Sequence, residues 1–95
     1  GWAVDSLGLT LEFSGGLRQS DAENPNFYTL EDVATQTPVS IDTIVYDDVH
    51  HRVTVSVQSN WAYDTWYRLD VHGIMDASDR LIAGYTLEFK TQPQP

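Results

Sequence analysis

Apolar and polar positions alternate most clearly between residues 66 and 73 of this chain. The apolar positions are Tyr67, Leu69 and Val71, and the positions between them are Trp66, Arg68, Asp70 and His72. Successive side chains on a β-strand point to opposite faces, so the stretch predicts a half-buried strand with Trp66 on its outer face. The same alternation recurs at Arg52–Val57 and Tyr85–Phe89, which we predict to be its neighbours.

Three further strands are predicted from shorter runs of the same kind. They are Leu9–Ser14, Phe27–Leu30 and Val39–Tyr46. Within the last run the apolar period shifts between Ile41 and Ile44, which predicts a β-bulge near Asp42–Thr43 because one extra residue reverses the facing. Ser20–Glu23 has the spacing of a capping box and predicts a single helical turn that ends at Pro25.

Turn signals separate these runs at intervals of roughly 8–12 residues. The predicted connections are Gly15–Gly16, Glu31–Asp32, Ala34–Pro38, Asp47–His51, Gln58–Thr65 and Met75–Gly84, and residues 1–6 are a predicted lead-in. About seven short strands in this order predict an all-β, immunoglobulin-like antiparallel sandwich. We expect one such domain over residues 1–91, and the Gln-Pro-Gln-Pro stretch at 92–95 predicts the start of a C-terminal linker.

Composition and charge narrow the range of functions. Fourteen acidic residues stand against five basic ones, for a formal net charge of −9. Such a surface repels phosphate backbones and anionic lipids, so we expect no nucleic-acid partner. No run of about 18 apolar residues is present, so we expect no membrane insertion. The absence of cysteine excludes disulfides, thiolate metal sites and a cysteine nucleophile.

Several segments resemble the bacterial Ig-like domains of S-layer proteins, adhesins and secreted modular enzymes. The matching segments, in the order of the family, are Leu9–Ser14, Asn26–Leu30, Trp66–Gly73, Asp76–Leu81 and Leu87–Thr91. One departure is that Asp79–Arg80 stands where the family has Gly-Asn. The turn therefore predicts a left-handed backbone at Asp79, which Asp tolerates better than most residues.

The resemblance implies a non-catalytic module that spaces or presents other domains of a secreted or cell-surface bacterial protein. Its partners would be neighbouring domains of the same polypeptide, and the isolated domain would be monomeric. Tyr67 resembles the tyrosine that anchors Ig-like corners through its hydroxyl group. An enzyme is not expected, because no Ser lies in a G-x-S-x-G elbow and so small a domain has little means to build a deep cleft.

Asp76 and Asp79 are the candidate metal ligands. Calcium takes six to eight oxygen ligands, often several carboxylates, so an acidic loop suggests a calcium site. The alternative is that these acids build turns, with Asp76 capping backbone N–H groups of its own loop. The adjacent His50–His51 pair is interpreted as a solvated turn, since neighbouring residues on an extended chain point in opposite directions. No other cofactor is expected.

Trp66, Trp61 and Tyr63 are the candidate ligand-binding residues. An outward Trp on a sheet can stack on a sugar ring, so the alternative function is a carbohydrate- or protein-binding (adhesion) module. Two other roles for Trp66 are a cation–π contact with Arg68 and packing against an adjoining domain. Trp61 stands where the family usually has an aliphatic core residue. If the neighbouring strands pair as predicted, Arg68 forms an ion pair with Glu88.

Overall fold

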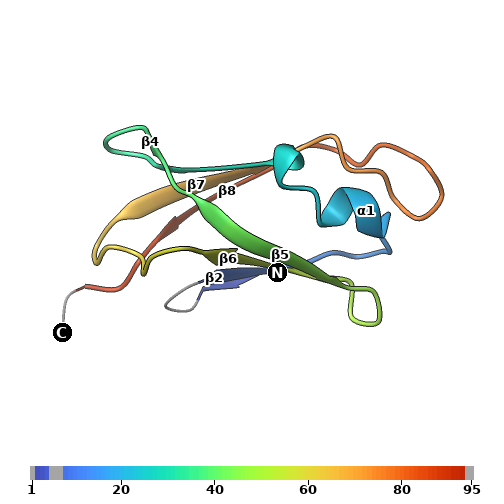
Figure 1. Cartoon of the computed structure of the whole chain (residues 1–95), viewed down its shortest axis with the longest axis horizontal. Helices are drawn as coiled ribbons and strands as arrows, with labels where there is room; N and C mark the ends of the chain where they lie inside the picture. The colour runs from blue at the N-terminus through green and yellow to red at the C-terminus, as the bar shows by residue number, and fades with distance from the viewer. Residues whose placement is uncertain (1, 5–7, 94–95) are drawn as a thin grey trace.

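Two antiparallel sheets of four strands each face one another in a computed structural model of the chain, which describes residues 2–4 and 8–93 (Figure 1). The first sheet has the order β1 (Trp2–Val4), β2 (Gly8–Glu12), β6 (Arg52–Val57), β5 (Ile41–Asp47). The second has the order β4 (Thr37–Pro38), β3 (Tyr28–Asp32), β7 (Trp66–Val71), β8 (Tyr85–Lys90). The predicted all-β antiparallel sandwich is confirmed.

Two short helical segments carry the chain from the first sheet to the second. They are α1 (Gln19–Ala22) and the 3-10 turn η1 (Pro25–Phe27). The predicted helical turn is therefore present, but the predicted capping box is wrong. The helix begins after Arg18, which makes no side-chain cap. Glu23 instead accepts a hydrogen bond from the backbone N–H of Tyr46 at 2.9 Å, so a contact with β5 replaces the local cap.

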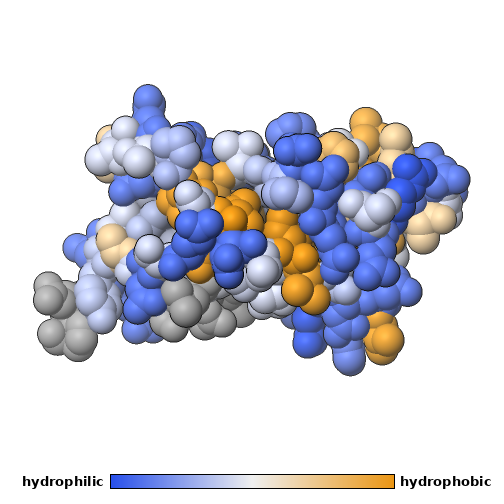
Figure 2. All heavy atoms as spheres, in the orientation of Figure 1, coloured by the Kyte–Doolittle hydropathy of each residue, from blue (hydrophilic) through white to orange (hydrophobic). Residues whose placement is uncertain are grey.

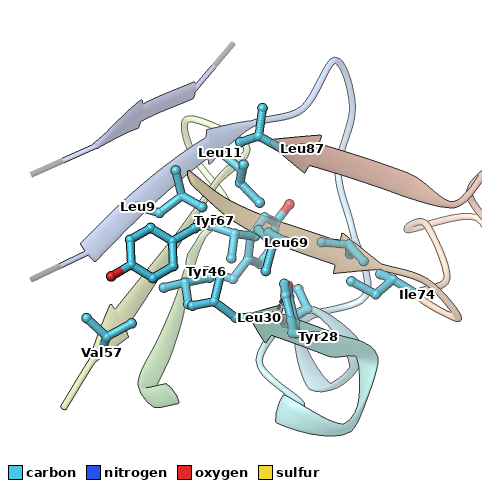
Figure 3. Close-up of a cluster of buried hydrophobic side chains, with 14 of the residues drawn as sticks. Leu9, Leu11, Tyr28, Leu30, Tyr46, Val57, Tyr67, Leu69, Ile74 and Leu87 are labelled. Atoms are coloured by element: carbon cyan, nitrogen blue, oxygen red, sulfur yellow. Dashed lines mark hydrogen bonds between the residues drawn. The ribbon is translucent and has the colours of Figure 1, made fainter. Parts of the chain in front are cut away.

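The core lies between the two sheets and is built from their inward-facing side chains (Figure 3). The buried apolar residues of the strands are Leu9, Leu11, Tyr28, Leu30, Tyr46, Val53, Val55, Val57, Tyr67, Leu69, Val71, Leu87 and Phe89. Leu17, Ala22 and Ile74 close one end of this core from the connecting segments. Among the described residues, no polar or charged residue is buried. The alternation in the sequence thus corresponds to one dry, apolar face on each sheet.

Strand β5 contains the predicted bulge. Its pairing with β6 shifts register between Ile41 and Thr43, after which Ile44 pairs with Val55 and Tyr46 with Val53. Without the extra residue, the second half of the strand would turn its apolar side chains to solvent. Partly buried apolar side chains remain visible along β5 at the open edge between the sheets (Figure 2).

The predicted pairing of Arg52–Val57 with the strand around Trp66 is wrong. Strand β7 pairs with β3 and β8, with Leu69 opposite both Leu30 and Leu87. Strand β6 lies in the other sheet, between β2 and β5. A strand that packs against β7 across the core has the same alternation of apolar and polar residues as a strand that is hydrogen-bonded to β7 within one sheet. The sequence pattern alone does not separate these two arrangements.

Three shorter segments also differ from expectation. Strand β3 continues through Glu31 and Asp32, which were predicted to end it, and β4 forms inside the predicted loop Ala34–Pro38. The Oδ1 atom of Asp32 accepts hydrogen bonds from the N–H groups of Ala34 and Thr35, and the tight turn brings Thr37 opposite Asp32. Strand β1 forms within the predicted lead-in, and the predicted linker at 92–95 lies partly outside the described residues.

Truncating a side chain at the centre of this core should destabilise the whole module. We expect Leu69→Ala to lower the free energy of unfolding by about 2–5 kcal/mol, because Leu69 is fully buried and the vacated space cannot be refilled. Val45→Ala is the matched control, since Val45 is 56% exposed on β5 and should change stability by no more than about 0.5 kcal/mol. Urea unfolding measures both, and equal losses would contradict the assignment of the core.

Candidate functional site

The residues identified from the sequence lie at opposite ends of the sandwich. Tyr63 and Trp66 lie at the end where the chain leaves β8, on the left of Figure 1, which we call the aromatic end. Asp76 and Asp79 lie in the loop between β7 and β8, on the right of Figure 1 with α1 and the β5–β6 turn. The structure therefore separates the candidate ligand-binding residues from the candidate metal ligands.

Trp61 points into the core instead of joining the exposed aromatic residues. Its ring centroid lies 4.8 Å from that of Tyr67 and 5.3 Å from that of Phe89, so it fills the core position that an aliphatic residue was expected to hold. Tyr63 and Trp66 are 58% and 50% exposed. The hydroxyl of Tyr67 accepts a hydrogen bond from the N–H of Ala62 at 2.9 Å, which confirms the predicted anchoring of this corner.

Arg68 lies on the same outer face as Trp66, between two carboxylates from neighbouring strands. Its Nε and Nη2 atoms donate to Oε2 of Glu88 at 2.9 and 2.6 Å, and Nη1 donates to Oε1 of Glu31 at 2.9 Å. The predicted Arg68–Glu88 pair is confirmed. The hydrogen bonds that Arg68 donates to Glu88, followed by the charge of Glu88, raise the pKa of Arg68. The guanidinium group is thus held in a three-strand ladder across β3, β7 and β8.

Trp66 is flanked by an ion pair. It lies opposite Lys90 on β8, and the Nζ atom of Lys90 is 2.9 Å from Oδ1 of Asp64. All of these groups are solvent-exposed. The aromatic end therefore presents exposed aromatic side chains beside charged ones, an arrangement suited to contact with another surface.

Asp76 organises the backbone of its own loop. Its Oδ1 atom accepts hydrogen bonds from the N–H groups of Ser78 at 2.8 Å and Arg80 at 2.9 Å, as the capping interpretation predicted. These bonds, that from Arg80 foremost, lower the pKa of Asp76 because they favour the ionised carboxylate. Asp79 has φ of 63°, so the predicted left-handed backbone is confirmed, and its carboxylate pairs with Arg18.

The geometry of the two acids bears on the calcium hypothesis. Oδ1 of Asp76 is occupied by two backbone donors, and Asp79 is paired with a guanidinium group. Across residues 2–4 and 8–93, no three His, Asp or Glu side chains gather in a way that would hold a metal ion. Calcium binding by Asp76 and Asp79 therefore stays a prediction, tested below.

A surface groove that we did not predict lies beside this loop. It has a volume of about 510 Å³ and is lined by residues 13–17, 76–78 and 82–85. Phe13, Ile82 and Tyr85 give it apolar walls. Backbone hydrogen bonds hold the walls together, since the N–H of Ala77 donates to the carbonyl of Gly16 at 3.1 Å. The only signal in the sequence was the small residues around it, which we interpreted as turn formers.

The chain belongs to the family of bacterial Ig-like domains, whose sequence profile matches residues 3–91. Its fold is similar to those of solved fragments of the surface layer protein SbsC. The structure of domains 1-6 aligns with a TM-score of 0.83 and 17% identity over 94% of this chain. The structure of the N-terminal part of SbsC aligns with a TM-score of 0.84 and 17% identity over 94% of this chain. The structure of rSbsC(31-844) aligns with a TM-score of 0.83 and 19% identity over 98% of this chain.

The chain corresponds to a small part of those proteins, covering 12%, 21% and 13% of their respective lengths. A comparison with curated protein sequences finds no match. No helix in the described residues has the length and apolar character needed to cross a bilayer.

The lowered pKa of Asp76 predicts a pH-dependent contribution to stability. An Asp whose pKa is depressed on folding stabilises the fold above its unfolded pKa of about 3.9, and this contribution is lost as the pH falls through the folded value. We expect Asp76→Asn to be less stable than the wild type at pH 6, with the difference shrinking below about pH 4. Urea unfolding across this range measures it. Asp42→Asn, at the exposed bulge of β5, is the control and should show no such convergence.

A thermal melt in excess calcium and then in EDTA tests the metal hypothesis. We expect overlapping curves, because one carboxylate oxygen of each of Asp76 and Asp79 already has a protein partner. A ligand that binds only the folded state, present at a concentration of one hundred times its Kd, adds about 2.7 kcal/mol to the free energy of unfolding. A melt would resolve a difference of that size. A calcium-dependent rise in Tm that disappears in Asp76→Asn would show that the loop rearranges into a calcium site.

Proposed function

We propose that this chain is a structural, spacing module of a larger bacterial protein that is secreted or displayed at the cell surface. Its partners are the neighbouring domains of the same polypeptide, and it carries out no reaction itself. The observation that carries the proposal is the use of polar side chains within the sandwich. They cap loops and link strands.

Three sets of contacts support this interpretation. Arg68 joins Glu31 and Glu88 across three strands, and Asp76 closes its own loop. The hydroxyl of Tyr46 accepts from the N–H of Leu17 at 2.8 Å and donates to Asp48 at 3.1 Å. Each set stiffens a connection that would otherwise move. An elongated body with principal extents of 44 × 24 × 20 Å is suited to setting the distance between other domains.

The second candidate is a binding module that recognises a glycan or a partner protein. The exposure of Tyr63 and Trp66 at one end favours it, because aromatic side chains open to solvent suit stacking on a sugar or packing on a protein.

Exchange of the module within the parent protein distinguishes the two candidates. We expect replacement of residues 1–95 by an unrelated β-sandwich of similar length to preserve surface display and function, whereas deletion should impair them. Antibodies against a part of the parent protein outside this module, applied to intact cells, measure the display. If the replacement behaves like the deletion, the module contributes a specific contact, and the spacing function is wrong.

Retention on a glycan array then tests the alternative. Specific retention that Trp66→Ala abolishes, and that the matched surface change Val45→Ala leaves unchanged, would support a binding module. Both side chains are exposed, at 50% and 56%, so neither change should unfold the domain.

A further inference from the structure

We propose that the groove of residues 13–17, 76–78 and 82–85 receives the aromatic end of the preceding module, forming a head-to-tail contact between successive sandwiches. The occupant is a β-sandwich of the same class that presents exposed aromatic side chains, such as Tyr63 and Trp66 here. The inference rests on the proposed spacing function and adds to it the surfaces that fix the angle between modules.

The groove is built before any partner arrives. The N–H of Arg18 donates to the carbonyl of Met75 at 2.9 Å, and the N–H of Ala77 donates to that of Gly16 at 3.1 Å. On the far side, the N–H of Ile82 donates to the carbonyl of the fully buried Ile74 at 3.0 Å. Preorganised walls lower the ordering cost of binding. The volume of about 510 Å³ lies within the usual range for sites that accept organic side chains or ligands.

Exposed large apolar side chains gather at the two ends of the sandwich. Val49 and Leu81 are 83% and 64% exposed, and Tyr85 lines the groove, all at the groove end. Figure 2 shows small, separate apolar spots at the right, over the β5–β6 turn and the β7–β8 loop, with hydrophilic surface between them. Tyr63 and Trp66 lie at the other end. Each end thus presents exposed apolar side chains to a contacting surface.

The direction of the chain places a preceding module at the groove. Strand β1 runs antiparallel to β2, with Trp2 opposite Leu11 and Val4 opposite Leu9. A polypeptide that enters β1 therefore approaches from the side of Phe13, which begins the groove wall. The chain leaves β8 at the aromatic end, beside Trp66 (Figure 1). Modules joined in series thus bring an aromatic end toward a groove end.

A tandem of two copies, joined directly from residue 95 of the first to residue 1 of the second, tests the proposal. In this tandem, the aromatic end of the first copy faces the groove of the second. With isotope labels in the second copy only, we expect NMR amide shifts at residues 13–17 and 76–85 relative to the single chain. Trp66→Ala in the first copy should abolish these shifts. Trp66→Ala in the second copy is the matched control and should leave them unchanged, because its aromatic end is free.

A second set of variants tests the groove side of the contact. Leu81→Ser with Tyr85→Ser in the second copy should loosen the tandem, seen as a larger maximum dimension in X-ray scattering, while the same changes in the first copy should not. Absence of groove shifts, or equal effects of a change in either copy, would overturn the contact. That result would leave the spacing function standing, since module exchange in the parent protein tests it separately.

Discussion

The burial of one apolar face of each sheet against the other is the constraint on which this structure depends. Val55 and Leu69, at the middle of β6 and β7, are completely removed from solvent, and the other inward residues extend the same dry layer. A crossing between the sheets must therefore supply partners for the polar groups that it brings into this layer, and among the described residues Nε1 of Trp61, in the β6–β7 crossing, is a buried atom without one. Tyr28 and Tyr46 solve the problem at one end, because their rings lie in the core while their hydroxyl groups bond the carbonyl of Ala22 and the N–H of Leu17. Burial accordingly raises the pKa of both phenols.

The pattern of apolar and polar residues correctly predicted features that depend only on residues close together in the chain. The alternation around Trp66, the bulge after Ile41, and the left-handed Asp79 were all legible in the sequence, because each follows from side-chain facing or backbone sterics at a few positions. The pairing of the strands could not be predicted in this way. Whether β6 lies beside β7 or across the core from it depends on contacts between distant segments, and both arrangements bury the same residues.

The candidate site shows the same division. Trp66 was correctly placed on an outer face from its alternation, but Trp61 lies in a connection without periodicity, where nothing local indicates which way a side chain points. The groove was missed for a related reason. Its walls come from two distant parts of the chain, residues 13–17 and residues 76–85, and their closeness results from the antiparallel pairing of Leu17 with Asp76 and of Met75 with Leu81. Small residues in turns favour such an approach without specifying it.

The strand order has a kinetic consequence. The pairs that join the centre of each sheet, β2 with β6 and β3 with β7, connect strands that are separated by much of the chain, whereas the β5–β6 hairpin is local. The long loops between those strands must close, at a cost in chain entropy, before the contacts between the strands can form. Sandwiches of this kind therefore fold slowly, commonly on timescales of about milliseconds to seconds. Interactions absent from the transition state slow unfolding. Contacts between distant strands that form after the transition state therefore lengthen the lifetime of the folded state, a quantity separate from its equilibrium stability.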